Sequence, residues 1–315
     1  MASFDAINYS LRPSKSIQRQ IVFDGVRLLT DVMNLDRLAY VGFGSIWFTD
    51  FVLAHKVLRI DDMVSIEATD IGYIRAKFNA PYSTVRVEHG LSTAILPKLF
   101  DDPSLARRPW MLWLDYDYEF NDSVRDDVRS VIENAPVDSI LVITFNGVDR
   151  KYGQRPAERV AYLRNLFGSV VPDELEPAAC KAEEMQVTLA DLGLDFMISI
   201  ASEIARPGGF VPAFRVLYRD GAPMVTIGGI LPVRGAARGV RDLVSGTSWP
   251  AQPSKPIVAP PLTMREAAVL QSLLPCATKL NRGDIQKLGF DLEDEQIEAF
   301  ETYYRQYPAF AQIVS

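Results

Sequence analysis

The chain has few of the residues that build metal sites or disulfide frameworks. Its 315 residues include two histidines and two cysteines, Cys180 and Cys276. The cysteines lie far apart and show no metal-ligand spacing, which argues against a disulfide framework and fits a reducing compartment. We therefore expect a cytoplasmic protein of bacterial type.

Long apolar runs and an excess of basic residues are also missing. No uncharged apolar stretch approaches the roughly 20 residues that a membrane-spanning helix needs, and no signal peptide is recognisable at the N-terminus. The formal net charge is −7 and the isoelectric point about 5.1. Proteins that bind nucleic acid usually present a basic face, so the negative net charge does not favour such a partner. A local basic patch is still compatible with a negative net charge.

Short apolar segments alternate with helical patterns in the first half of the chain. Apolar residues at helical spacing predict a helix over 17–33, capped by Ser14 or Ser16. Strands are predicted over 38–43, 63–67, 84–88, 110–114 and 139–145, separated by helices or helical turns over 47–58, 71–78, 92–100 and 122–133. Because such alternation is typical of a parallel, doubly wound sheet, we predict an α/β fold.

The second half of the chain has a different organisation. Residues 151–205 form a helix-rich insert, and Asp220-Gly221 between two apolar runs predicts a late β-hairpin. A stretch rich in Ser, Pro and Gly over 245–261 is typical of a linker. We predict an α/β domain over 1–244, this linker, and a small helical subdomain over 262–315.

A Gly-x-Gly turn follows the first predicted strand, at Gly42 and Gly44, and Ser45 comes next. Glu67 ends the second predicted strand, 23 residues after Gly44. Backbone N–H groups of such a turn, with a helix N-terminus, can face a nucleoside-type ligand, while the carboxylate accepts hydrogen bonds from ribose. The pattern predicts a nucleoside-cofactor site, although a Gly-x-Gly turn that binds nothing is the alternative.

Five β/α units followed by a late hairpin resemble the class I S-adenosylmethionine-dependent methyltransferases over roughly 36–232, in particular bacterial O-methyltransferase-like proteins. The resemblance implies a seven-stranded, mostly parallel Rossmann-like sheet and S-adenosyl-L-methionine as cofactor. Gly42 and Gly44 match the family's first motif, acid-x-Gly-x-Gly-x-Gly, and Glu67 matches its ribose-binding acid. The motif's leading acid and third glycine are replaced by Tyr40 and Ile46.

Two further stretches correspond to motifs of this family. Gly90-Leu91-Ser92 matches its adenine-reading Gly-Asp-Ser, with Leu91 in place of the acid. Asp115, at the end of the fourth strand, matches the first metal ligand of the metal-dependent O-methyltransferases. Asn146 matches a second ligand, but Phe145 replaces the third, so we expect no required metal.

Asp115 is also the best candidate for a general base. The carboxyl end of the fourth strand faces the cofactor cleft in this topology, and a carboxylate there can take a proton from an acceptor hydroxyl or amine. Asp117, two residues later, either supports Asp115 or points elsewhere. Arg12 and Lys15 lie in the N-terminal segment that the resemblance places over the cofactor mouth. They would meet the cofactor's methionine carboxylate or an anionic substrate, or form a solvated helix entry.

Three functions fit these residues. The first is methyl transfer from S-adenosylmethionine to an oxygen or nitrogen of an unidentified acceptor. The second is a catalytically degenerate binding or sensor subunit of a larger assembly, which the replaced motif residues favour. The third is an NAD-dependent oxidoreductase, because Gly-x-Gly with a later acid fits that class too. A protein partner or a homo-oligomer is compatible with each.

Overall fold

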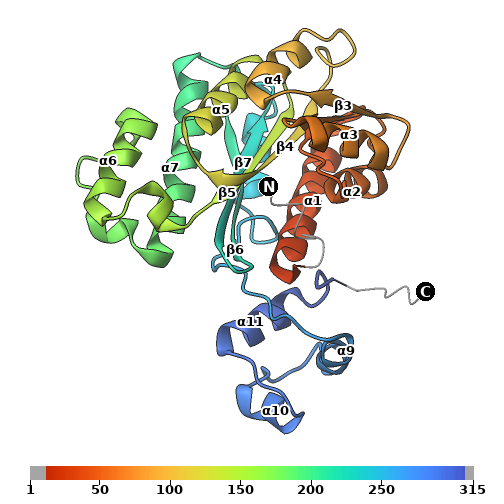
Figure 1. Cartoon of the computed structure of the whole chain (residues 1–315), viewed down its shortest axis with the longest axis vertical. Helices are drawn as coiled ribbons and strands as arrows, with labels where there is room; N and C mark the ends of the chain where they lie inside the picture. The colour runs from red at the N-terminus through yellow and green to blue at the C-terminus, as the bar shows by residue number, and fades with distance from the viewer. Residues whose placement is uncertain (1–11, 309–315) are drawn as a thin grey trace.

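A seven-stranded sheet forms the centre of the computed structural model, which describes residues 12–308 (Figure 1). Its strand order is β3-β2-β1-β4-β5-β7-β6. Neighbouring strands are parallel from β3 to β5, whereas β7 runs antiparallel to both β5 and β6. The strands are β1 (Ala39–Gly42), β2 (Met63–Glu67), β3 (Val85–His89), β4 (Trp110–Glu119), β5 (Ser139–Asn146), β6 (Val211–Arg219) and β7 (Pro223–Leu231). The predicted α/β fold with a doubly wound sheet and a late antiparallel hairpin is confirmed.

Helices cover both faces of the sheet, and each face has its own hydrophobic core. One core is shared by α4 (Ser92–Phe100), α5 (Asp122–Asn134), α6 (Pro156–Phe167) and α7 (Ala182–Glu203). The other is shared by α1 (Pro13–Met33), α2 (Thr49–Leu58), α3 (Asp70–Asn79) and α8 (Ala237–Val244). Strand residues alternate between the two cores: Ala39 and Val41 lie in the first, and Tyr40 between them lies in the second. This alternation follows from the two-residue repeat of a strand.

Helix α7 is the one described helix that is long and apolar enough to cross a membrane by length and composition. Within its most apolar stretch, 61% of the residues are buried inside the molecule. It packs on β6 and β7 as part of the core.

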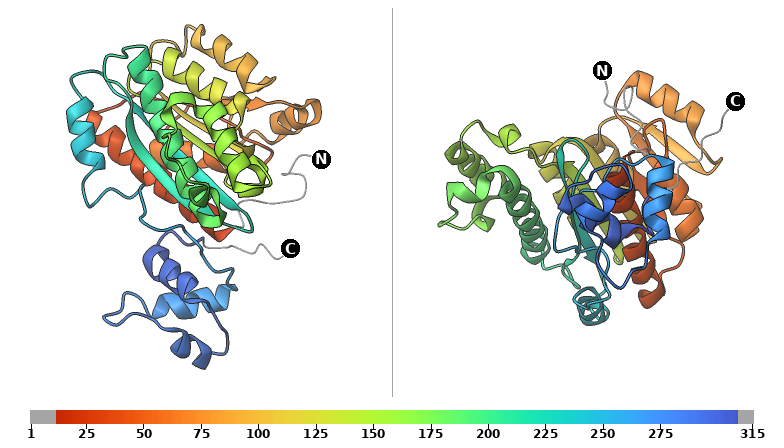
Figure 2. Two further views of the ribbon diagram at one scale, coloured as in Figure 1. Left: turned by 90° about the vertical axis from the view of Figure 1, so that its left-hand side faces the viewer. Right: turned by 90° about the horizontal axis from the view of Figure 1, so that it is seen from below.

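The C-terminal helices form a group set apart from the sheet (Figures 1 and 2). They are α9 (Met264–Ser272), α10 (Arg282–Lys287) and α11 (Asp294–Tyr303). The segment before them lies along the edge strand β6, where the Ile257 N–H donates to the Leu217 carbonyl at 2.8 Å. The segment thereby pairs part of an edge that would otherwise expose unpaired backbone groups. The predicted division into domain, linker and subdomain stays a prediction.

Strand β4 continues further than the sequence predicts. It was expected to end at residue 114 but runs to Glu119, with a register shift against β5 between Asp115 and Glu119. Its first half is buried, whereas Asp117 and Tyr118 are exposed, because pairing with β1 ends at Trp113 and pairing with β5 is interrupted between Asp115 and Glu119. Asp115 and Asp117 therefore lie within the strand instead of after it. Helix α8 was not predicted.

The first helix starts earlier than predicted, and its cap comes from elsewhere in the chain. It begins at Pro13, not at residue 17, and neither Ser14 nor Ser16 caps it. The carboxylate of Asp220, in the β6–β7 turn, accepts hydrogen bonds from the backbone N–H groups of Ser14 (3.2 Å) and Lys15 (2.6 Å). These are the unpaired donors that a helix N-terminus must satisfy. The contact with Asp220, distant in sequence, thus replaces a local N-cap and fixes the position of Lys15 in the first turn of the helix.

Removing this distant cap should destabilise the protein. We expect Asp220→Ala to lower the free energy of unfolding by about 1–2 kcal/mol, as loss of an N-cap does. Asp242→Ala, at an exposed position of α8, is the matched control and should change it by less than about 0.5 kcal/mol. Urea denaturation of the two variants and the wild type measures this. Equal stabilities of the two variants would contradict the role of Asp220.

Candidate functional site

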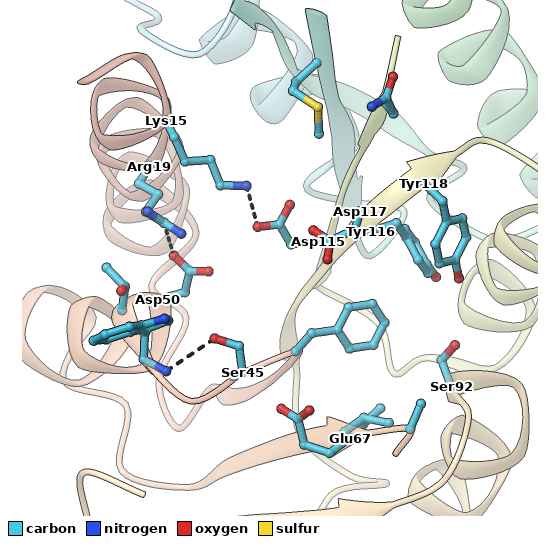
Figure 3. Close-up of a pocket in the computed structure, with 18 of the residues that line it drawn as sticks. Lys15, Arg19, Ser45, Asp50, Glu67, Ser92, Asp115, Tyr116, Asp117 and Tyr118 are labelled. Atoms are coloured by element: carbon cyan, nitrogen blue, oxygen red, sulfur yellow. Dashed lines mark hydrogen bonds and ion pairs between the residues drawn. The ribbon is translucent and has the colours of Figure 1, made fainter. Parts of the chain in front are cut away.

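A cavity of about 470 Å³ opens beyond the carboxyl ends of β1, β2 and β4 (Figure 3). Strands β1 and β4 are neighbours from which the chain continues toward opposite edges of the sheet. Ligands of open α/β sheets bind in the crevice at such a switch point. The predicted residues that line the cavity are Arg12, Lys15, Gly44, Ser45, Glu67, Gly90, Leu91, Ser92, Asp115 and Asp117.

Gly42 is the predicted residue that does not line the cavity. It lies inside β1, paired with Trp113 of β4, where a Cβ atom would come within 2.8 Å of the Trp113 carbonyl oxygen. Its glycine is explained by this close packing between strands. The prediction that Gly42 contacts a ligand therefore has no support from its position.

The second glycine of the turn connects the loop to Glu67 through one serine. The Gly44 N–H donates to Ser65 Oγ at 3.1 Å, and the Ser65 hydroxyl donates to Glu67 Oε1 at 3.4 Å. A Cβ atom at Gly44 would lie 2.5 Å from the Phe48 ring and 2.7 Å from Ser65 Oγ. Because both neighbours are buried, only glycine fits. The turn and the carboxylate therefore form one rigid unit at the cavity wall.

Glu67 is a buried carboxyl group, with 7% of its surface exposed. Burial raises its pKa to about 7, although hydrogen bonds from the Ser65 hydroxyl and the Ser45 backbone N–H hold it down. Desolvation disfavours the charged form, and donors that reach the carboxylate favour it. A ligand that brings hydroxyl donors to Glu67 would therefore stabilise the ionised group.

Two ion pairs lie at one end of the cavity, between α1 and the strand ends (Figure 3). Lys15 Nζ forms a close ion pair with Asp115 Oδ2. One turn further along α1, Arg19 Nε meets Asp50 Oδ1 of α2 at 2.6 Å. All four side chains are at least four-fifths buried. This end thus presents both signs of charge on side chains fixed by packing.

Arg19 and Asp50 were not predicted from the sequence. Arg19 stands four residues after Lys15, the spacing that places two side chains on one helix face. That signal becomes readable only when the helix is known to start at Pro13. Asp50 carries no local signal, because its partner lies 31 residues earlier in the chain.

Arg12 and Tyr218 complete this end of the cavity. The Arg12 guanidinium donates to the Asp220 carbonyl oxygen at 2.8 Å, and Lys15 Nζ lies 5.7 Å from the centre of the Tyr218 ring. Burial raises the pKa of Tyr218 well above its ordinary value, and the nearby negative charge of Asp115 adds to the effect. Tyr218 therefore stays protonated at neutral pH.

The opposite end of the cavity is mainly aromatic. The Phe43 and Tyr116 rings meet edge to face at 5.2 Å, and Tyr118 packs on Tyr116 at 5.3 Å. Ser92 and Leu91 complete this wall, and the Leu91 side chain is 64% exposed at the rim. A flat, uncharged ring system suits this end better than a charged group.

Asn146 lines the same cavity as Asp115. Within residues 12–308, no group of three or more His, Cys, Asp or Glu side chains is arranged to hold a metal ion. Phe145, which stands where the metal-dependent enzymes have an acid, lies in the core and not in the cavity. That no metal is required stays a prediction.

A protein-family model described as "Putative O-methyltransferase" matches residues 7–315. No curated protein matches the chain.

Several solved structures are similar at low identity. Trm1 from Pyrococcus horikoshii with S-adenosyl-L-methionine has 12% identity and a TM-score of 0.44, over 71% of this chain and 57% of that one. A mutant of MtNAS in complex with S-adenosylmethionine has 11% identity and a TM-score of 0.35, over 67% of this chain and 62% of that one. An rRNA methylase from Streptococcus thermophilus has 10% identity and a TM-score of 0.35, over 67% of this chain and 93% of that one. None is similar enough to assign a function to this chain.

Replacing Glu67 should change how stability depends on pH. The pKa of Glu67 is raised from 4.5 to about 7 in the folded protein. The protonated side chain therefore contributes stability that is fully present below about pH 4.5 and is lost as pH rises through 7. Glu67→Gln has no charge to bury, so its free energy of unfolding should exceed that of the wild type at pH 8 by on the order of 3 kcal/mol. At pH 4.5 this difference should vanish.

Urea denaturation of both proteins at pH 4.5, 6 and 8 measures this difference and cancels the pH response of all other groups. A difference that is the same at each pH would show that Glu67 does not titrate in this range.

Proposed function

Because the chain belongs to the family described as "Putative O-methyltransferase", we propose that it binds S-adenosylmethionine in this cavity and transfers the methyl group to an acceptor oxygen. The observation that carries the proposal is that one cavity joins the Gly44 turn, the buried Glu67 and Asp115. When bound, this cofactor supplies a methyl group on a positively charged sulfur, ready for displacement.

The polarity of the cavity supports this cofactor. Glu67 can accept hydrogen bonds from two ribose hydroxyls. The Lys15–Asp115 and Arg19–Asp50 pairs offer a cation and an anion to the ammonium and carboxylate of an amino-acid head group. The aromatic end suits the base. The volume of about 470 Å³ lies within the usual range of roughly 300–1,000 Å³ for small-molecule sites.

Methyl transfer requires little chemistry from side chains. Holding the acceptor in line with the methyl group and excluding water supply much of the rate. Asp115 then takes the proton from the acceptor hydroxyl, a contribution of about 10²–10⁴-fold for a positioned base. Lys15 holds Oδ2 of Asp115, so Oδ1 is the oxygen that would receive the proton.

A binding module without turnover is the second candidate. The observation that favours it is that Asp115 is already engaged by Lys15, in addition to the replaced residues Tyr40, Ile46 and Leu91. Family membership does not favour the nicotinamide-dependent alternative. A thermal-shift comparison of NAD with S-adenosylhomocysteine separates that alternative from the proposed cofactor.

S-adenosylhomocysteine should bind the wild type and depend on Glu67. We expect Glu67→Ala to weaken binding by about 1–3 kcal/mol through loss of a charged acceptor. The matched control is Glu88→Ala, on the adjacent strand outside the cavity, which should leave the affinity unchanged. Isothermal titration measures all three. If the folded wild type does not bind S-adenosylhomocysteine, the proposed cofactor is wrong. If the wild type and Glu67→Ala bind it with equal affinity, Glu67 does not bind the ribose.

Turnover separates the enzyme from the binding module. The protein is incubated with S-adenosylmethionine labelled on the methyl group and a bacterial small-molecule extract, and labelled products are counted. We expect Asp115→Asn to lower labelling by about 10²-fold or more. Binding of S-adenosylhomocysteine to this variant is measured in parallel, so that lost catalysis is not confused with lost affinity. Tight cofactor binding by the wild type without any labelled product would favour the binding module.

A further inference from the structure

Helix α3 exposes an apolar face at one side of the molecule, beside the edge strand β3 (Figure 1). Within residues 12–308, the three most exposed large apolar side chains are Phe78 (89% exposed), Ile71 (70%) and Ile74 (65%), and all three belong to this helix. Single exposed apolar side chains are ordinary on a protein surface, whereas a cluster of them marks an interaction site. These three residues form the α3 face.

The helix packs on the sheet through its small residues instead of its large ones. An amphipathic helix usually buries its large apolar residues and exposes its polar ones. In α3, Gly72 and Ala76 are buried, and Ala76 lies in the core on this side of the sheet. Because positions 71, 74 and 78 recur at helical spacing, the α3 face forms one stripe, turned away from these small residues. Burying this stripe against another apolar surface would be favourable.

Two opposite charges flank the α3 face at matched positions. Asp70 precedes Ile71 and Lys77 precedes Phe78, so one charge stands beside each end of the stripe. The two charged residues are seven positions apart, close to two helical turns, which places both on the same side of the stripe. The α3 face therefore carries an acid at its beginning and a base at its end.

Both charges are accessible to a second molecule. The Asp70 side chain is 88% exposed, and its Oδ1 lies 3.3 Å from His89 Nε2, which is an ion pair only when His89 is protonated. Lys77 is exposed, its Nζ lies 5.3 Å from the centre of the Tyr73 ring, and it has no ion-pair partner among residues 12–308. Surface contacts of these kinds are weak, so they leave both groups free to meet an opposite charge.

A second copy of the chain is the partner that matches this pattern. A two-fold axis near Ile74 sets two α3 helices antiparallel, so that the stripe of one copy meets the stripe of the other. Asp70 of each copy then faces Lys77 of the other copy, which gives two equal ion pairs. Such an interface is isologous, because the same patch serves both copies and must complement itself. A stripe flanked by one sign of charge would instead repel its own copy.

We propose that the α3 face is the contact surface of a reversible homodimer with antiparallel α3 helices. The inference goes beyond the proposed function and does not depend on it. A standard stable interface buries roughly 800 Å² on each partner, more than one face of a 10-residue helix provides. The dimer therefore belongs to the weak, transient class, and we expect a dissociation constant on the order of 10–100 µM.

Sedimentation velocity of the full chain measures this equilibrium, over concentrations from about tenfold below to about tenfold above the expected constant. Phe78→Asp should weaken the dimer by about hundredfold or more, because burying an unpaired carboxylate is costly. The matched control is Val187→Asp, at an exposed apolar position of α7 outside the α3 face, which should change the constant by less than about twofold. Circular dichroism checks that each variant is folded.

A charge-swap experiment tests the antiparallel geometry separately from apolar burial. Asp70→Lys leaves two cations beside the stripe, and Lys77→Glu leaves two anions. Each variant alone should dimerise about fivefold or more weakly than the wild type, because like charges then meet across the two-fold axis. An equimolar mixture of the two variants should form a heterodimer about as tight as the wild-type dimer, since every cation again faces an anion.

Three results would overturn the inference. The first is a wild type that stays monomeric over the whole concentration range, and the second is a dimer that Phe78→Asp weakens no more than Val187→Asp does. The third is a mixture of the charge variants that associates no more tightly than either variant alone. If Phe78→Asp does not fold, Ile74→Asp in the same stripe takes its place and should show the same loss. None of these results depends on cofactor binding, so they are distinct from a failure of the proposed function.

Discussion

Two acids hold the N-terminus of α1 against the carboxyl ends of the strands. Asp220 caps the helix from the β6–β7 turn, and Asp115 of β4 pairs with Lys15 in its first turn. Without these contacts, the helix end would leave its N–H groups unpaired and the cavity would lack one wall. Because the same Asp115 is the proposed base, one side chain would serve both the stability of the fold and the proposed catalysis. This constraint ties the late hairpin to the start of the chain.

The cavity concentrates groups that are costly to bury. Glu67, Asp115 and Asp127 are acids inside or behind the wall, and only Asp115 has a full counter-charge among the contacts described. Burying a charge without complete pairing destabilises a fold. Two apolar cores, one on each face of the sheet, offset this cost. These incompletely paired acids lie together at one end of the sheet. A ligand that donates hydrogen bonds to them would recover part of the cost of burying them.

The sequence predicted the fold class and the family resemblance, and both are confirmed. Alternating apolar segments and an Asp-Gly turn are local signals, so they predict strands, helices and a hairpin reliably. Gly44, Glu67 and Asp115, which the sequence predicted as site residues, line one cavity, and their roles stay predictions. The structure differs from the prediction at element ends, such as that of β4, and Gly42 is not among the residues that line the cavity. Arg19 was missed because α1 was predicted to start at residue 17 instead of Pro13, and Asp50 because its partner lies 31 residues earlier in the chain.

The sequence by itself determined the order of elements, and with it the switch point between β1 and β4 where the cavity lies. Hydrophobic periodicity decides that order, because each strand and helix must bury its apolar face. The tertiary structure alone decided how the charges of the site are paired. The Asp220 cap, the Lys15–Asp115 pair and the Arg19–Asp50 pair each join segments distant in sequence. Hydrogen bonds and ion pairs act only at contact distance, and no local pattern records which distant groups will meet.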